Sequence, residues 1–239
     1  MPSYYYPDSF EIGTCAVLST EETTHALRVM RLEPGDHLTL LNGRGDRADA
    51  ILLPNESSRR MRQANCRIES MENIPCPNPS IILYVAPPRN KNMDAVLKAA
   101  TELGVSKIVP IICRYAVSKP ESEPPATWTN VLITAMKQSG NPWLPILAPP
   151  TTFQDALSAS HENGFFGAVP RPGETNTDVA MISEKSIALW VGPEGGFAPE
   201  EEQALRDKGL HPLTAGPWIL RVETAVTALL GAIHIMLNA

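Results

Sequence analysis

The amino-acid sequence predicts an α/β protein in which a small β-rich unit precedes a domain built on a mainly parallel sheet. From residue 81 onward, short apolar runs alternate with segments of helical spacing, which is typical of parallel sheets. The first 75 residues instead carry short alternating segments bounded by turn residues. Between these regions, residues 73–80 hold three prolines, which exclude a helix or a central strand. We therefore expect one domain over residues 1–74 and a second over residues 75–239.

The expected N-terminal unit rests on a hairpin and one helix. Residues 36–41 alternate toward a strand, and residues 48–53 predict the return strand. Between them, the Asn-Gly-Arg-Gly-Asp segment at 42–46 is a strong turn signal. Residues 23–31 have helical spacing, and the Pro-Gly pair at 34–35 ends that helix.

The second domain is predicted from apolar runs and helical periodicity. Four apolar runs predict strands at residues 81–85, 108–113, 165–169 and 187–191, the first of them buried on both faces. Five segments with helical spacing predict helices at residues 93–103, 126–139, 155–160, 199–208 and 222–237.

Composition limits the class of protein. The chain has 239 residues, of which 43% are hydrophobic and 19% charged, as in ordinary soluble globular proteins. We find no apolar run near the ~20 residues that span a bilayer and no signal-peptide pattern. The four cysteines form no C-x-x-C pair and the five histidines share no spacing, so we expect free thiols, no metal site and a cytoplasmic location.

The charge is unevenly distributed. The net charge of −6 argues against attachment to nucleic acid by bulk charge. Residues 28–67 nevertheless contain eight Arg, no Lys and five acidic residues, so this segment is locally basic. A short Arg cluster is most simply a solvated surface, although the guanidinium fork suits phosphate.

The last fifty residues contain two segments of the same design, in which an apolar strand runs into a glycine-rich turn and a helix follows. The turns lie at 192–196 and 215–217. Glycine lets backbone amides approach a ligand closely, and a helix start adds unpaired N–H groups. Two such turns could share one ligand. Neither matches a phosphate loop or a dinucleotide fingerprint, so the residues alone leave a structural turn as an equal alternative.

Arg221 and Glu223 stand at the start of the last predicted helix. One interpretation is a surface ion pair, which contributes little stability. However, Arg at the positive end of a helix is slightly unfavourable, which favours a phosphate or substrate role. No nucleophile elbow or Ser/His/Asp order is present, so a hydrolase is disfavoured.

The two C-terminal motifs together resemble those of the RsmE family, the 16S ribosomal RNA uridine N3-methyltransferases of the SPOUT class. The motifs are G-P-E-G-G-F at 192–197 and G-x-x-I-L-R-x-E-T-A at 216–225. Three further matches lie in the family's order at 101–110, 137–145 and 25–36. Five ordered matches extend the resemblance over nearly the whole chain.

The resemblance implies a PUA-like β-barrel RNA-binding domain at residues 1–74 and a SPOUT α/β trefoil-knot methyltransferase domain at residues 75–239. It also implies S-adenosylmethionine (SAM) as the cofactor, 16S ribosomal RNA of the small subunit as the partner, and a homodimer with the site near the subunit interface. By position, the residues expected to line the cofactor are Val191, Gly192, Pro193, Glu194, Gly195, Gly196, Leu213, Gly216, Ile219 and Leu220.

The same resemblance places Arg221 and Glu223 at the transferred methyl and the uridine. Arg221 could stabilise charge on the base or hold a phosphate, and Glu223 could take the N3 proton or orient Arg221. Binding of RNA should weaken with salt. The expected RNA contacts are His25, Arg28, Arg31, Arg59, Arg60 and Arg62.

Two features leave alternatives open. The family's Arg after Q-S-G is Asn141 here, followed by Pro142 and Trp143, and the overall acidity is unusual for a ribosomal RNA binder. The alternatives are a SPOUT methyltransferase with another RNA target, or a non-catalytic RNA-binding or ribosome-assembly factor.

Overall fold

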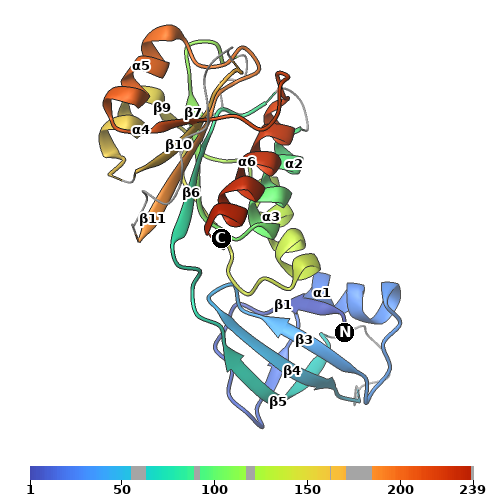
Figure 1. The fold of residues 1–239 in the computed structure, drawn as a ribbon. Coiled ribbons are helices and arrows are strands. Elements are labelled where there is room, and N and C mark those ends of the chain that lie inside the picture. The colour runs from blue at the N-terminus through green and yellow to red at the C-terminus, as the bar shows by residue number, and fades with distance from the viewer. Residues whose placement is uncertain (55–62, 89–91, 117–121, 162, 171–184, 238–239) are drawn as a thin grey trace. The chain divides into compact units, whose positions relative to one another are not determined.

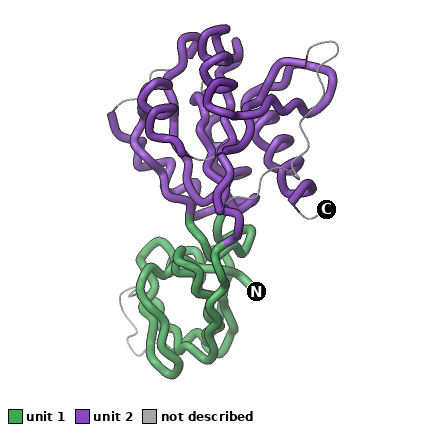
Figure 2. Tube along the Cα trace, turned by 60° about the vertical axis from the view of Figure 1, so that its left-hand side comes forward, with its two compact units in different colours: residues 1–76, 136–144 green, residues 77–135, 145–239 purple. Residues whose placement is uncertain are grey.

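The chain forms two compact units, shown in Figure 2. The computed structural model describes residues 1–54, 63–88, 92–116, 122–161, 163–170 and 185–237. The first unit comprises residues 1–76 together with 136–144, and the second comprises residues 77–135 and 145–239. The chain first passes from one unit to the other inside the proline-rich segment. The return of residues 136–144 to the first unit had no signal in the sequence.

The first unit is a mixed five-stranded sheet (Figure 1). Its strand order is β1-β3-β4-β5-β2, with β1 parallel to β3 and the other neighbours antiparallel. The predicted hairpin is confirmed, because β3 and β4 pair across the 42–46 turn. Only these two strands were predicted individually. The strands are β1 (Ser3–Tyr5), β2 (Cys15–Val17), β3 (His37–Leu41), β4 (Asp46–Leu52) and β5 (Asn65–Asn73).

The helix predicted at 23–31 is wrong in its start and its geometry. Helix α1 (Thr20–Thr24) begins earlier, because the Ser19 hydroxyl caps it by accepting a hydrogen bond from the Glu22 backbone N–H at 3.2 Å. It continues into a π-helix, η1 (His25–Val29), where the Met30 N–H donates to the His25 carbonyl. Periodicity of 3.6 residues does not reveal a π turn.

The unusual Asn141-Pro142-Trp143 segment is fastened to the β3–β4 turn within the first unit. The Leu144 N–H donates to the Gly43 carbonyl and the Gly45 N–H donates to the Pro142 carbonyl, both at 3.0 Å. The Trp143 indole N–H donates to the Ile74 carbonyl at 3.0 Å. The residues that depart from the family pattern therefore have a structural role here.

Gly45 is the position where this fastening leaves no room for a side chain. A Cβ there would overlap the Trp143 ring and lie 2.9 Å from the Ile74 oxygen, and the residue has φ +96°. Gly35 has nearly the same φ, +98°, but open space around it. We expect Gly35→Ala to lower the free energy of unfolding by about 1–2 kcal/mol through left-handed strain. Gly45→Ala should cost about 1–3 kcal/mol more through overpacking.

Urea unfolding of the two variants checks this comparison, since their backbone strain is matched. Equal losses of stability in Gly45→Ala and Gly35→Ala would contradict the proposed contact between Gly45 and Trp143.

The second unit contains a seven-stranded sheet in which all pairings between the described strands are parallel, as predicted. The order is β12-β10-β11-β6-β7-β8, and β9 also pairs with β7. Because all these strands run the same way, their carboxyl ends meet at one edge. The strands are β6 (Ser80–Val85), β7 (Val105–Ile112), β8 (Ile146–Leu147), β9 (Thr151–Thr152), β10 (Gly164–Gly167), β11 (Ser186–Val191) and β12 (His211–Leu213).

Helices cover both faces of this sheet, as Figure 1 shows. Helices α2 and α6 lie side by side on one face, and α4 and α5 lie on the other. Each of the five helices in the described part of this unit was predicted, and the bounds of α3 and α6 agree with the prediction to the residue. The helices are α2 (Asn92–Glu102), α3 (Ala126–Ser139), α4 (Phe153–Ala159), α5 (Pro199–Asp207) and α6 (Val222–Leu237).

The central strands are buried on both faces, which explains their continuous apolar runs. Tyr84 of β6 and Trp190 of β11 stack with ring centroids 4.1 Å apart, in the cluster that includes Phe153 of α4. The preceding residues in the same strands, Leu83 and Leu189, point to the opposite face of the sheet and are fully buried there. This two-sided burial fixes the carboxyl ends of β6 and β11 at the edge where the site forms.

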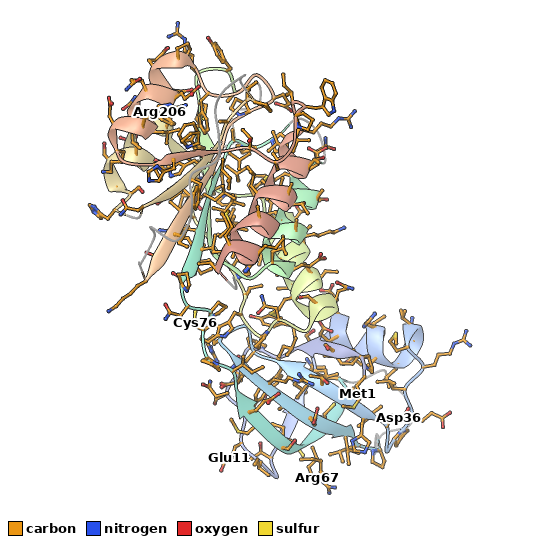
Figure 3. The ribbon with its side chains drawn as sticks, viewed as in Figure 1. Met1, Glu11, Asp36, Arg67, Cys76 and Arg206 are labelled. Carbon is orange, nitrogen blue, oxygen red and sulfur yellow. The ribbon has the colours of Figure 1, made fainter. Side chains whose placement is uncertain are left out.

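Side-chain contacts hold helix α5 in place near its start and near its end. The buried Glu201 carboxylate accepts from the Ala198 N–H at 2.9 Å and from the Arg114 N–H at 2.8 Å, tying the helix start to the turn after β7. Arg206, labelled in Figure 3, places its guanidinium 5.3 Å from the Phe166 ring centroid. These contacts hold the segment between the two glycine-rich turns.

The cysteines divide into two exposed and two buried thiols. Cys15 and Cys76 are exposed, whereas burial raises the pKa of the Cys66 and Cys113 thiols from 9.0 to about 12. We expect a thiol reagent at pH 8 to modify two cysteines quickly in the native protein and four after unfolding, followed by absorbance.

The raised thiol pKa values also set a pH dependence. The folded protein keeps these two protons to higher pH than the unfolded chain does. Their contribution to stability is therefore complete below about pH 9 and is lost as the pH rises toward 12. In the thiol-reagent experiment, rapid modification of a third cysteine in the native protein would contradict the division into two exposed and two buried thiols. Cys76 is marked in Figure 3.

Two further observations concern the described residues only. No helix among them is long and apolar enough to cross a membrane. The trefoil knot implied by the resemblance stays a prediction, because residues 171–184, which connect β10 to β11, lie outside the described part of the chain.

Candidate functional site

A pocket lies where three neighbouring parallel strands end. Strands β12, β10 and β11 are adjacent in the sheet, so the loops after them converge at the carboxyl edge. The space between the pocket walls is about 690 Å³, a volume that includes open solvent. The lining residues are Gly167, Ala168, Val169, Pro170, Val191, Gly192, Pro193, Glu194, Gly195, Gly196, Leu213, Ala215, Trp218, Ile219, Leu220, Val222, Ala225 and Leu229.

The turn after β11 forms one wall and is tightly closed. The Gly196 N–H donates to the Pro193 carbonyl at 2.8 Å. Gly192 is buried, and a Cβ at this position would lie 3.1 Å from the Phe197 nitrogen and 3.2 Å from the Gly196 carbonyl carbon. A side chain at 192 would therefore require the Gly196–Phe197 backbone to shift by a few tenths of an ångström. At its three glycines, the turn has no side chains between its main chain and the pocket.

The loop between β12 and α6 forms the facing wall. It is anchored at its start, where the Ala168 N–H donates to the Leu213 carbonyl at 3.1 Å. Leu213 is buried, whereas Trp218 and Ile219 remain 78% and 71% exposed although both line the pocket. This wall thus combines an apolar base with an exposed apolar rim.

Helix α6 contributes one face to the pocket and carries the predicted catalytic residues beside it. Val222, Ala225 and Leu229 line the pocket, as helical spacing requires. Arg221 and Glu223 flank Val222 and are not among the lining residues. The first turn of α6 also leaves backbone N–H groups without helical partners.

Glu223 is oriented by a neighbouring helix. The Asn92 side-chain amide at the start of α2 donates to Glu223 Oε1 at 3.2 Å. Glu223 Oε2 has no hydrogen bond from the residues that the structure describes. No pattern in the sequence points to Asn92, because it lies 131 positions from its partner. Arg221 is exposed, and its side chain makes no ion pair with a described residue.

The structure gathers nine of the ten residues predicted to line the cofactor around this one pocket. Gly216 is the exception: it lies in the same loop, exposed, with φ +100°. Sequence reasoning missed the contributions of Trp218 and of the α6 face. The end of β10 was not among the predicted site residues either, although the convergence of parallel strand ends could have indicated it.

The predicted RNA contacts all belong to the first unit. Arg28 and Arg31 are exposed, on and just after the π-helix. His25 is half-buried, with its ring edge-on to Tyr4 and its Nδ1 buried without a hydrogen bond to any described residue. Arg59, Arg60 and Arg62 lie outside the described residues. Among the residues that are described, no cluster of His, Cys, Asp or Glu could hold a metal ion.

Comparison with known proteins identifies the family. Residues 75–234 match the family model of the RNA methyltransferase domain. The chain belongs to the RNA methyltransferase family. Residues 18–54 of this RNA methyltransferase also match the model of the RNA methyltransferase PUA domain, which confirms the predicted fold class.

Individual relatives agree over nearly the full length of this RNA methyltransferase. It is 31% identical over 233 residues to ribosomal RNA small subunit methyltransferase E of Aquifex aeolicus, covering 95% of each chain. Ribosomal RNA small subunit methyltransferase E of Neisseria gonorrhoeae, solved with bound SAM, is 27% identical with a TM-score of 0.84, covering 99% of this chain and 98% of that one. A structure from Legionella pneumophila with the bound cofactor SAM is 29% identical with a TM-score of 0.84, covering 98% and 96%.

Proposed function

We propose that this RNA methyltransferase transfers a methyl group from SAM to N3 of one uridine in the 16S ribosomal RNA of the small subunit. The observation that carries the proposal is the pocket formed by two glycine-rich turns at the ends of parallel strands. It is supported by relatives named ribosomal RNA small subunit methyltransferase E and by their SAM-bound structures.

The residues present fit this cofactor. SAM joins a flat adenine, an apolar thioether region and a polar amino-acid end, and when bound it supplies a methyl group carried on a sulfonium. Leu213, Ile219 and Leu220 offer apolar surface for the adenine side. The 192–196 turn offers main-chain donors and acceptors, and the absence of a Cβ at Gly192 lets the backbone at Gly196 and Phe197 pack closely against it.

Two residues at the start of α6 are proposed to act on the uridine. N3 carries a proton that must leave before its lone pair can attack a methyl group. Glu223 Oε2 is the carboxylate oxygen left open by the Asn92 hydrogen bond, so it can accept that proton. The exposed Arg221 guanidinium can stabilise negative charge on the base carbonyls or hold an adjacent phosphate.

We propose that residues 1–74 bind RNA and residues 75–239 carry out methyl transfer. The chain is acidic overall, with a net charge of −6, so RNA binding has to depend on a local basic surface. Arg28 and Arg31 are the exposed candidates in the described part, and Arg59, Arg60 and Arg62 are added by sequence. We also propose a homodimer that acts in the cytoplasm, as the family resemblance implies.

Transfer of labelled methyl groups tests the proposal. The protein is incubated with methyl-labelled SAM and with three acceptors: small subunits lacking this modification, naked 16S ribosomal RNA, and total tRNA. We expect label in ribosomal RNA and none in tRNA. Label in tRNA alone would favour another RNA target. RNA binding without transfer, at saturating SAM, would favour a non-catalytic assembly factor.

A further inference from the structure

The rim of the pocket carries a large aromatic side chain that the proposed chemistry leaves without a role. Trp218 lines the pocket, yet 78% of its surface is exposed. The next residue in the loop, Ile219, is 71% exposed, and Val169, which follows β10 and also lines the pocket, is 44% exposed. Single exposed apolar residues are common, but three that line the mouth of one pocket indicate a surface for a ligand.

The loop holds Trp218 at the rim by constraints on both sides. Pro217 precedes it and fixes one backbone angle, and the Leu213 carbonyl accepts a hydrogen bond from the Ala168 N–H, just after β10. Beyond it, the Ala225 N–H donates to the Arg221 carbonyl at 2.8 Å and starts α6. An indole has only two side-chain torsions, so ordering it in a complex costs little entropy.

A positive charge three positions after Trp218 in the chain favours a nucleic-acid base as the occupant of the rim. Arg221 follows three positions later, exposed and without an ion pair to any described residue, at the positive end of α6. A nucleotide combines a flat base for the indole with a phosphate for the guanidinium. An acidic carboxylate, Glu194, also lines the pocket, but it lies on the other glycine turn.

We infer that the Trp218 indole is the platform on which the unstacked target base rests while its ring nitrogen faces the pocket. This inference rests on the proposed function, since a base has to leave its RNA stack to reach a methyl donor held in the pocket. Stacking on an aromatic side chain compensates for the stacking lost in the RNA. Because every base has a π-face, Trp218 positions the base while other groups select it.

Substitution of Trp218 tests the platform. We expect Trp218→Ala to weaken RNA binding and raise KM about tenfold to a hundredfold, with SAM affinity unchanged within twofold. Trp218→Phe, which keeps an aromatic face, should recover most of the loss. Trp128→Ala is the matched control, because Trp128 is a half-buried Trp of α3 that does not line the pocket.

A second measurement reads contact without turnover. Uridine-containing RNA added to the S-adenosylhomocysteine complex should quench a component of tryptophan fluorescence that is present in the wild type and absent in Trp218→Phe. If the wild type binds RNA but transfers no methyl group, the proposed function fails. The quenching experiment would still show whether the Trp218 indole contacts a base.

Three results would overturn the inference. Loss of SAM affinity in Trp218→Ala would mean that the indole stacks on the cofactor. A changed oligomeric state in sedimentation would mean that a second copy of the chain covers it. Unchanged RNA affinity and KM, with no Trp218-dependent quenching, would mean that the indole contacts no base.

Discussion

Gly192→Ala is expected to lower SAM affinity at least tenfold while the protein remains folded. The added Cβ would lie 3.1–3.3 Å from the Phe197 nitrogen, the Gly196 carbonyl carbon and the Phe197 ring, and two of these atoms belong to the backbone. Backbone atoms can yield only if the whole turn shifts. Such a shift would misalign the main-chain groups that the turn presents to the pocket, and a tenfold loss corresponds to about 1.4 kcal/mol.

Gly195→Ala provides the matched control within the same turn. A Cβ at 195 would meet its nearest neighbour, the Tyr115 Cβ, at 3.4 Å, an ordinary contact. Titration calorimetry should therefore give nearly wild-type SAM affinity for Gly195→Ala, and near-ultraviolet circular dichroism should show both variants folded. Wild-type affinity in Gly192→Ala would contradict the role of this turn in holding the cofactor.

Arg221→Ala is expected to reduce methyl transfer by a factor of about 10²–10³ while SAM affinity changes less than twofold. Losses of this size follow removal of a group that stabilises charge in the transition state. The guanidinium is exposed and lies beside the pocket rather than among its lining residues, so cofactor binding should survive. Arg221→Lys should retain part of the rate, since it keeps the charge without the fork.

Lys185→Ala controls for the loss of one positive charge. Lys185 is exposed and precedes β11, so it lies at the edge of the sheet opposite the pocket. Single-turnover rates with saturating RNA separate chemistry from binding. An equal loss of rate in Arg221→Ala and Lys185→Ala would mean that Arg221 acts only through its positive charge and not through a specific contact. An equal loss of rate and of SAM affinity in Arg221→Ala would assign it to the cofactor site.

Sequence patterns predicted the second unit well because its signals are local. Continuous apolar runs become strands only when both faces are covered, as β6 and β11 are, and helices such as α6 are bounded by their own periodicity. The very short β8, β9 and β12 have only two or three residues each, too few to show a period. Their pairing depends on neighbouring strands already being in place.

Other features of the fold depend on contacts between distant residues. The π turn at His25–Val29 cannot be read from helical spacing. Trp143 packs against Gly45, which lies 98 positions away in the sequence. Because no local pattern indicates this contact, the sequence showed the Asn-Pro-Trp segment only as a departure from the family motif. Gly45 itself was predicted as a turn residue, but its close contact with the Trp143 side chain was not predicted.

The part of the site formed by the two glycine-rich motifs was predictable from the sequence. The part formed by residues that only the tertiary structure brings together was not. The motifs placed Gly192 and Leu220 at one ligand, and the pocket contains both. The Asn92 contact with Glu223 brings two helix starts together across 131 positions and has no sequence pattern. The exposure of Trp218 likewise depends on how its loop lies against the pocket, which composition does not reveal.

The chemical identity of the product nucleoside tests the account most directly. Small subunits that lack the modification are incubated with the protein and SAM, and their ribosomal RNA is digested to nucleosides for mass spectrometry against synthetic standards. We predict a single new nucleoside, 3-methyluridine, at one per subunit, formed by the wild type and strongly reduced in Arg221→Ala. Methyl groups found on uracil C5, on a ribose hydroxyl or on another base would contradict methylation at N3, even if the pocket binds SAM.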